Sequence, residues 1–412
     1  MTIYQTKQMK LMFFKGHNEV ITMKKTLSLI FAFSMAFFAF SQNSKIKFIK
    51  GNLADKTAAV REAETSDSQW ISEQAVAFCL ENKEALGNDR ELDGLAVAAV
   101  LSYTPENVRK LSDSQKQKLT ENLIALFTQF NKSSTVQIAV ISKALSLKDT
   151  ISNAPFTALL NSYLKTADVK SADSGVFKAS VSALEAIGNE ESFTILYGFL
   201  NDNSYSAYKK EIETTTIALI PNAMNEVIAL IKGADFQKIS SVFDLMKKNS
   251  QISKKNLCEI AENMLSESIL LVDNSSGISA DNIRFQIDVL SILSENNWTR
   301  ASAVALSYFD LSKKLYEKRN MSEEQFKTVI TSLRNIAPLD AVSPLIGYLE
   351  ELNDRTEKGN VVSSEIALAV INTLGAIGDK AAFDSLLAVT YLNYEESVLT
   401  AAREALSGLR WQ

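Results

Sequence analysis

The feature that most constrains the fold of this chain is an apolar stripe that recurs with the same spacing. Its clearest copy places Ala367, Val370, Ile371, Leu374 and Ile377 at offsets of 0, +3, +4, +7 and +10. This spacing puts all five side chains on one face of an α-helix. Other stretches follow the same offsets in whole or in part: Val140–Leu147, Phe177–Ile187, Ile239–Met246, Ile283–Leu293 and Phe326–Ile336. The stripe predicts a run of amphipathic helices.

Three copies of the stripe are followed by a short turn and a second apolar stripe in constant register. The turns are Gly188–Asn189, Ala337–Pro338 and Gly378–Asp379. Gly or Ala ends the first helix, and a polar residue or Pro begins the next. Each unit is therefore predicted to be a pair of helices.

The spacing of the stripes predicts about nine helix pairs and a final capping helix. Successive copies lie about 41 residues apart, and one longer gap holds an extra pair around Ile212–Ile231 with Pro221 at its turn. The other segments expected to be helical are Thr57–Asn82, Glu91–Phe130 with breaks at Thr104–Pro105 and Ser112–Asp113, and a last helix at about Glu395–Leu409. Repeats at a fixed period are typical of arrays in which each unit packs on its neighbours.

Composition supports helix throughout the repeated region. The chain has only 14 Gly and 5 Pro, and both residues disrupt helices. A sheet protein would need turn residues every ~8 to 12 positions, and the sequence lacks them. The hydrophobic content of 46% is enough to bury a core. We therefore predict an all-α fold, an α-α superhelix.

The N-terminal residues 1–41 have the pattern of a secretory signal peptide. Met23-Lys24-Lys25 is a charged start, Thr26–Phe40 is apolar, and Ala39–Ser41 supplies the small residues of a cleavage site. The apolar run is shorter than the roughly 20 residues that span a bilayer, so we expect cleavage and no stable membrane span. Because the stretch before the charged start is unusually long, translation is expected to begin at Met23. Residues 42–56 are expected to form an extended lead-in, and residues 57–412 the helical array.

Removal of residues 1–41 changes the charge of the chain. This segment carries five of the 43 basic and one of the 48 acidic side chains, so 38 basic and 47 acidic side chains remain, a net charge of −9. The negative balance disfavours nucleic-acid binding, which requires Lys and Arg against phosphate. The single histidine, His17, is also removed. The remaining chain then has no imidazole to act as general base or metal ligand.

Both cysteines lie on apolar stripes and are expected to be buried free thiols. Cys79 and Cys258 fall about five repeats apart. At ~8–10 Å per helix layer, that separation is far beyond the reach of a disulfide.

Motifs for catalysis, cofactors or metals are weak. Ser-x-x-Lys occurs at Ser44–Lys47, Ser162–Lys165 and Ser206–Lys209, without the companion motifs of Ser-Lys enzymes. Asp273–Asp281 has oxygen ligands at alternate positions, but its Gly is misplaced for an EF-hand and no Glu closes the loop. We predict no catalytic residues, no cofactor and no metal site.

Two sets of residues could contact a partner. Acidic pairs recur at Glu190–Glu191, Glu323–Glu324, Glu350–Glu351 and Glu395–Glu396. They are expected mainly to stabilise first turns and polar faces of helices, and an acidic ridge that meets a basic partner is the functional alternative. The second set is aromatic, with burial expected for most members: Trp70, Trp298, Trp411, Tyr205, Tyr208, Tyr391 and Tyr394.

The pattern Leu374-Gly-Ala-Ile-Gly-Asp379, followed by Phe383 and Leu386, resembles the HEAT-repeat family, and Leu184–Asn189 is similar. Most other units are degenerate, and the family's usual Arg and Pro positions are mostly absent. The 34-residue period of tetratricopeptide repeats does not fit. The resemblance implies an α-solenoid, armadillo-like in shape, whose curved surface binds other macromolecules.

These features favour an exported, non-enzymatic protein-interaction scaffold in the periplasm or cell envelope, or secreted. Two alternatives stay open. The first is a ligand-binding or enzymatic solenoid, like the HEAT-like lyases that handle tetrapyrroles, and it requires a deep pocket with converging polar groups. The second is a purely structural spacer, which predicts no exposed aromatic or single-sign patch.

Overall fold

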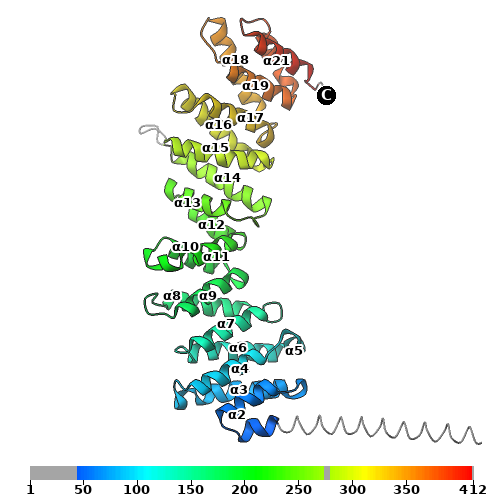
Figure 1. Ribbon diagram of the computed structural model, residues 1–412. Coiled ribbons are helices and arrows are strands. Elements are labelled where there is room, and N and C mark those ends of the chain that lie inside the picture. The colour runs from blue at the N-terminus through cyan, green and yellow to red at the C-terminus, as the bar shows by residue number, and fades with distance from the viewer. Residues whose placement is uncertain (1–43, 273–278, 411–412) are drawn as a thin grey trace, which may run out of the picture. The chain divides into compact units, whose positions relative to one another are not determined.

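The computed structural model describes residues 44–272 and 279–410, and these are helical with short connections (Figure 1). The all-α prediction is confirmed for them, since they contain no strand beyond an isolated bridge between Asp379 and Arg410. The expected signal peptide, residues 1–41, lies outside the described residues. The chain divides into two compact units. One holds the residues up to Gly188 with Phe199–Ile212, and the other holds Asn189–Gly198 with the residues from Glu213 on.

The first unit is built from consecutive helix pairs. Its helices are α2 (Leu53–Glu62), α3 (Thr65–Leu86), α4 (Arg90–Ser102), α5 (Pro105–Arg109), α6 (Asp113–Gln129), α7 (Ser134–Ser146), α8 (Ala154–Thr166) and α9 (Ser174–Ile187). The first helices of the pairs, α2, α4, α7 and α9, pack on one another in order. The second helices, α3, α6 and α8, do the same. The breaks predicted at Thr104–Pro105 and Ser112–Asp113 are confirmed, because Thr104 and Ser112 are N-caps.

Three elements link this series to the second unit: α10 (Glu190–Leu200), a 3₁₀ helix η1 (Asn203–Tyr208) and α11 (Lys209–Leu219). Residues of both units occur in α10 and in α11. Pro221, predicted at a turn, lies in η2 (Ile220–Asn222), directly after α11. No single helix in the described ranges is long and apolar enough to cross a membrane, although Asn203–Asn222 and Met224–Ile231 together meet that test as a bent pair by length and composition.

The second unit repeats the pairing. Its remaining elements are α12 (Met224–Ile231), α13 (Phe236–Lys247), α14 (Lys254–Leu270), α15 (Ala280–Glu295), η3 (Thr299–Ala301), α16 (Ser302–Glu317), α17 (Glu323–Ile336), α18 (Val342–Glu357), α19 (Ser364–Ile377), η4 (Lys380–Ala382), α20 (Phe383–Val389) and α21 (Glu396–Ser407). The first helices α15, α17, α19 and α21 pack in succession. Among the second helices, α12 packs on α14, α14 on α16, and α18 on α20. The last helix, α21, lies within the segment Glu395–Leu409 that was predicted to be helical.

The apolar stripes form the core of each unit. All five stripe residues of α17, Phe326 to Ile336, are fully buried, and in α19 only Ile377 is half-buried. Full burial of a Val, Leu, Ile or Phe side chain contributes about 1.5–3 kcal/mol, so each stripe is a large share of the stability of its pair.

The predicted turn at Gly378–Asp379 is also confirmed. Gly378 has a left-handed φ of 75°, and its N–H donates to the Leu374 carbonyl at 2.8 Å. The Asp379 carboxylate accepts from the N–H of Ala381 at 2.8 Å and so begins η4. This residue pair therefore sets the path from α19 into α20.

The extended lead-in expected at residues 42–56 is wrong for the part that the structure describes. Residues 44–50 are helical, and α2 begins at Leu53. Phe48 is buried edge-on against Trp70, with ring centroids 6.5 Å apart. The Lys56 ammonium donates to the carbonyls of Phe48 and Ile49, which lie at the end of the short helix. These tertiary contacts stabilise a helix where the sequence predicted an extended segment.

Candidate functional site

A hollow of the second unit lies between α18 and α20, and we call it the acidic groove. It has a volume of about 500 Å³. Four of its nine lining residues are carboxylates, Glu350, Asp354, Glu357 and Asp384, and the others are Asn353, Ser385, Ala388, Tyr391 and Leu392. Because α18 and α20 are second helices of neighbouring pairs, the groove follows from the packing of one pair on the next.

Hydrogen bonds fix the floor of the acidic groove. The buried Asn353 amide donates to the Ser385 carbonyl at 3.1 Å and accepts from the Tyr394 hydroxyl at 3.0 Å. The Ser385 hydroxyl donates to Glu350 at 2.8 Å. These bonds join α18, α20 and the segment after α20, so the spacing of the groove walls is set by satisfied polar groups.

The acidic groove presents uncompensated negative charge to solvent. Asp354 forms an exposed ion pair with Lys358 at 2.6 Å, which is worth little in water. Glu357 and Asp384 are exposed, and neither forms an ion pair with any of the described residues. Tyr391 lines the groove with 80% of its surface accessible. The groove therefore combines a negative potential with an accessible aromatic ring, and both suit a cationic protein segment.

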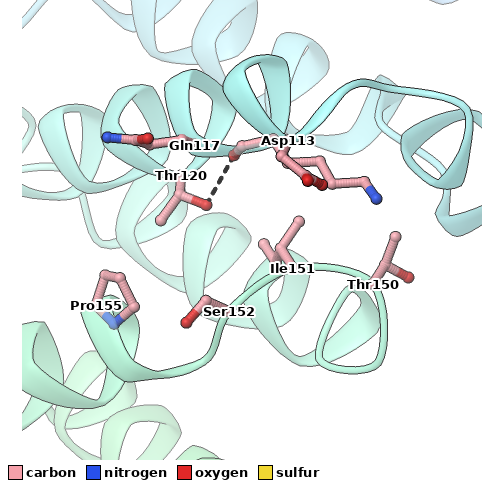
Figure 2. Close-up of a pocket in the computed structure, with 8 residues that line it drawn as sticks. Asp113, Gln117, Thr120, Thr150, Ile151, Ser152 and Pro155 are labelled. Carbon is pink, nitrogen blue, oxygen red and sulfur yellow. Dashed lines mark hydrogen bonds between the residues drawn. The ribbon is translucent and has the colours of Figure 1, made fainter.

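A hollow at the corresponding position of the first unit has different chemistry. It lies between α6 and the segment that leads into α8, and its volume is about 370 Å³ (Figure 2). Asp113 and Lys116 give it charges of both signs, and Gln117, Thr150, Ser152 and Pro155 complete much of its wall. The Thr120 hydroxyl donates to the Lys116 carbonyl at 3.0 Å (Figure 2). The strong acidity of the α18–α20 groove is thus not a general property of hollows between second helices.

The acidic pairs singled out in the sequence have mostly structural partners. Glu323 accepts from the Ser363 hydroxyl at 2.6 Å, and Glu351 pairs with Lys313 at 2.5 Å across neighbouring helix pairs. Glu324 pairs with Lys327 at 2.9 Å and Glu396 with Arg403 at 2.9 Å. Of the four pairs, only Glu350–Glu351 contributes a residue to the acidic groove.

The other groove carboxylates were missed in the sequence. Glu350, Asp354 and Glu357 occur at offsets of 0, +4 and +7, which places them on one face of α18. This spacing was the available signal. Asp384 carries no such signal, because its place in the groove depends on how α20 packs on α18.

The remaining candidates are placed as follows. Lys47 of the first Ser-Lys motif pairs with Glu62 at 2.9 Å. In the other two motifs both the Ser and the Lys are exposed, so neither pair lies in a buried site. Residues 273–278 of the calcium-like loop lie outside the described residues. Among the residues that the structure describes, no group of three His, Cys, Asp or Glu side chains is placed to hold a metal ion.

The aromatic candidates divide by exposure. Tyr208 and Trp298 have structural contacts: Tyr208 is buried, and the Trp298 indole donates to Glu262 at 2.7 Å. Tyr205 stacks on Phe199 with centroids 3.9 Å apart. Tyr391 and, to a smaller extent, Trp70 are exposed. Trp411 lies outside the described residues.

The burial predicted for both thiols is confirmed. Cys79 and Cys258 are free and fully buried. Burial raises the pKa of the Cys79 thiol to about 12, with the nearby Asp93 adding to the rise. The thiol is therefore held in its unreactive, protonated form.

Comparison of the chain with models of known protein families and with characterised proteins finds no match.

Proposed function

We propose that this protein is an exported, non-enzymatic interaction scaffold that binds a basic segment of a partner protein in the acidic groove. The proposal includes a HEAT-like α-solenoid of about nine helix pairs and a capping helix over residues 57–412. It is supported by the recurring stripes and by the packing of first helices on first helices within each unit. Export is supported by the pattern of residues 1–41.

The main support for this proposal is the negative charge of the acidic groove. Two unit charges ~4 Å apart attract by about 1 kcal/mol in bulk water and by several times more where protein partly replaces the water. Several carboxylates in one groove act together on a basic segment, and the rate of association rises with them. Tyr391 adds an exposed aromatic ring, and Tyr is among the residues that dominate binding energy at protein interfaces.

The direct test neutralises the two groove carboxylates that lack ion-pair partners. The ligand is a capped octapeptide of lysine and leucine, and its affinity is measured by calorimetry. The variant Glu357→Gln/Asp384→Asn should bind it about five- to thirtyfold more weakly, because each surface charge contributes ~0.5–1 kcal/mol to the binding free energy. The same change of charge at Glu84→Gln/Asp113→Asn, in the first unit, is the matched control and should leave binding nearly unchanged. Equal losses in both variants would reduce the effect to net charge and contradict a defined groove.

A further inference from the structure

A second hollow in the same unit has the opposite chemistry, and we call it the arginine groove. It lies on the first helices α15, α17 and α19 and has a volume of about 270 Å³. Its lining is polar and includes Arg334 but no carboxylate: Ser294, Thr331, Ser332, Asn335, Asn372 and Thr373. Glu295, which follows Ser294, is exposed and is not part of the lining.

Arg334 differs from several other arginines of this unit because no described carboxylate forms an ion pair with it. Arg300, Arg355 and Arg403 pair with Glu262, Glu317 and Glu396 at 2.9–3.0 Å. Arg334 instead donates from Nε to the Asn335 side-chain oxygen at 3.3 Å. This contact directs the Nε edge of the guanidinium to its own helix. The two Nη groups stay available to a ligand, and they form a planar pair of donors that matches a carboxylate.

The neighbouring side chains are already ordered. Asn335 donates to the Ser294 hydroxyl at 3.1 Å, which links α17 to α15. The Thr331, Ser332 and Thr373 hydroxyls donate to carbonyls one turn earlier in their helices. Asn372 is exposed, and its amide has no hydrogen bond to the described residues, so it can donate to a second ligand oxygen. The groove therefore offers a guanidinium without an ion-pair partner on α17 and an unused amide on the neighbouring α19.

Carboxylates on α17 and α19 lie away from the groove. In α17 and α19 they occur only in the first turn, at Glu323, Glu324 and Glu365. The groove is lined by residues of the later turns, so a ligand carboxylate would meet no like charge from these two helices. The backbone at their ends is also partly satisfied, because the Leu333 and Leu374 carbonyls accept from Ala337 and Gly378.

We propose that the arginine groove binds a carboxylate side chain of an acidic protein segment, with Arg334 as the ion-pairing residue and Asn372 as a second donor. The volume of the arginine groove limits the size of its ligand, because drug-sized ligands occupy larger pockets of ~300–1,000 Å³. A hollow of about 270 Å³ fits one Glu or Asp side chain and its backbone. This site is separate from the acidic groove and requires the opposite charge on its ligand.

The test follows side-chain Nε–Hε signals of protein labelled with ¹⁵N-arginine, and the Arg334 signal is assigned by its loss in Arg334→Gln. Capped tetraglutamate should shift the Arg334 signal in a saturable way, and capped tetraglutamine should not. Succinate and tetraglutamine with a free C-terminus show whether an isolated carboxylate or a chain end suffices. A shift by the free chain end but not by tetraglutamate would overturn the assignment to an acidic side chain.

A second measurement uses the affinity for capped tetraglutamate. Arg334→Gln should lower it about five- to tenfold, which is the loss expected for a partly exposed bidentate pair. The control Arg403→Gln removes an arginine that is already paired with Glu396 and should lower it less than twofold. Equal affinities in wild type and Arg334→Gln would refute the site. Binding of the basic octapeptide to the acidic groove should be unchanged in Arg334→Gln, so failure here is distinguishable from failure of the proposed function.

Discussion

Replacement of Gln286 by Leu should stabilise the protein, although it removes a polar group. Gln286 lies on the stripe of α15 at the +3 position, where α17 has Val329 and α19 has Val370. Its side chain is 0% exposed, and both atoms of its amide lack hydrogen-bond partners among the described residues. An unsatisfied buried polar group costs about 1–3 kcal/mol, and Leu has a similar size without that cost.

The assay should report on α15 itself, because long repeat arrays do not always unfold in one step. Native-state hydrogen exchange of the α15 amides should slow by about five- to 150-fold, the equivalent of ~1–3 kcal/mol. Gln137→Leu is the matched control. Gln137 is also buried, on α7, but its amide donates to the Phe127 carbonyl at 3.3 Å, so its loss should speed exchange in α7. Unchanged or faster exchange of α15 in Gln286→Leu would refute the reasoning.

Gly375→Val should destabilise the contact of α19 with α21 by about 1–3 kcal/mol, because a Cβ there would lie 2.8 Å from the Ala405 Cβ; faster proteolysis of α21 would show it. Cys79, whose pKa is raised to about 12 by burial, should react with a disulfide reagent at pH 8 only as fast as the protein opens, so native labelling as fast as in urea would contradict its burial. N-terminal sequencing of the protein from the cell envelope should begin at Gln42, and a sequence from Met1 or Met23 would disprove cleavage.

The helices could be predicted from the sequence because their signal is local. The offsets of 0, +3, +4, +7 and +10 correctly identified the buried faces of α17 and α19, and Gly378 and Asp379 correctly marked the turn after α19. The segment before α2 was predicted wrongly because its helix depends on the packing of Phe48 against Trp70. These residues are distant in the sequence, so no local sequence pattern indicates their contact.

The two grooves were harder to predict than the helices. Three acidic groove residues share one face of α18, but only Glu350 belongs to an adjacent Glu pair, so the search for such pairs did not identify Asp354 and Glu357. Asp384 and the arginine groove depend on the register in which one helix pair packs on the next. Residues such as Arg334 and Asn372, 38 positions apart, become neighbours only through that register.

Site-specific photo-cross-linking in the native cells tests whether a basic segment of a partner protein occupies the acidic groove. A photoreactive residue at Tyr391 lies in the acidic groove, and one at Leu339, which is 78% exposed between α17 and α18, is the control in the same unit. We expect a discrete adduct from position 391 and none from 339, with the attachment point in a Lys- or Arg-rich segment of the partner. Identical adducts from both positions, no adduct from 391, or attachment within an acidic segment would contradict it.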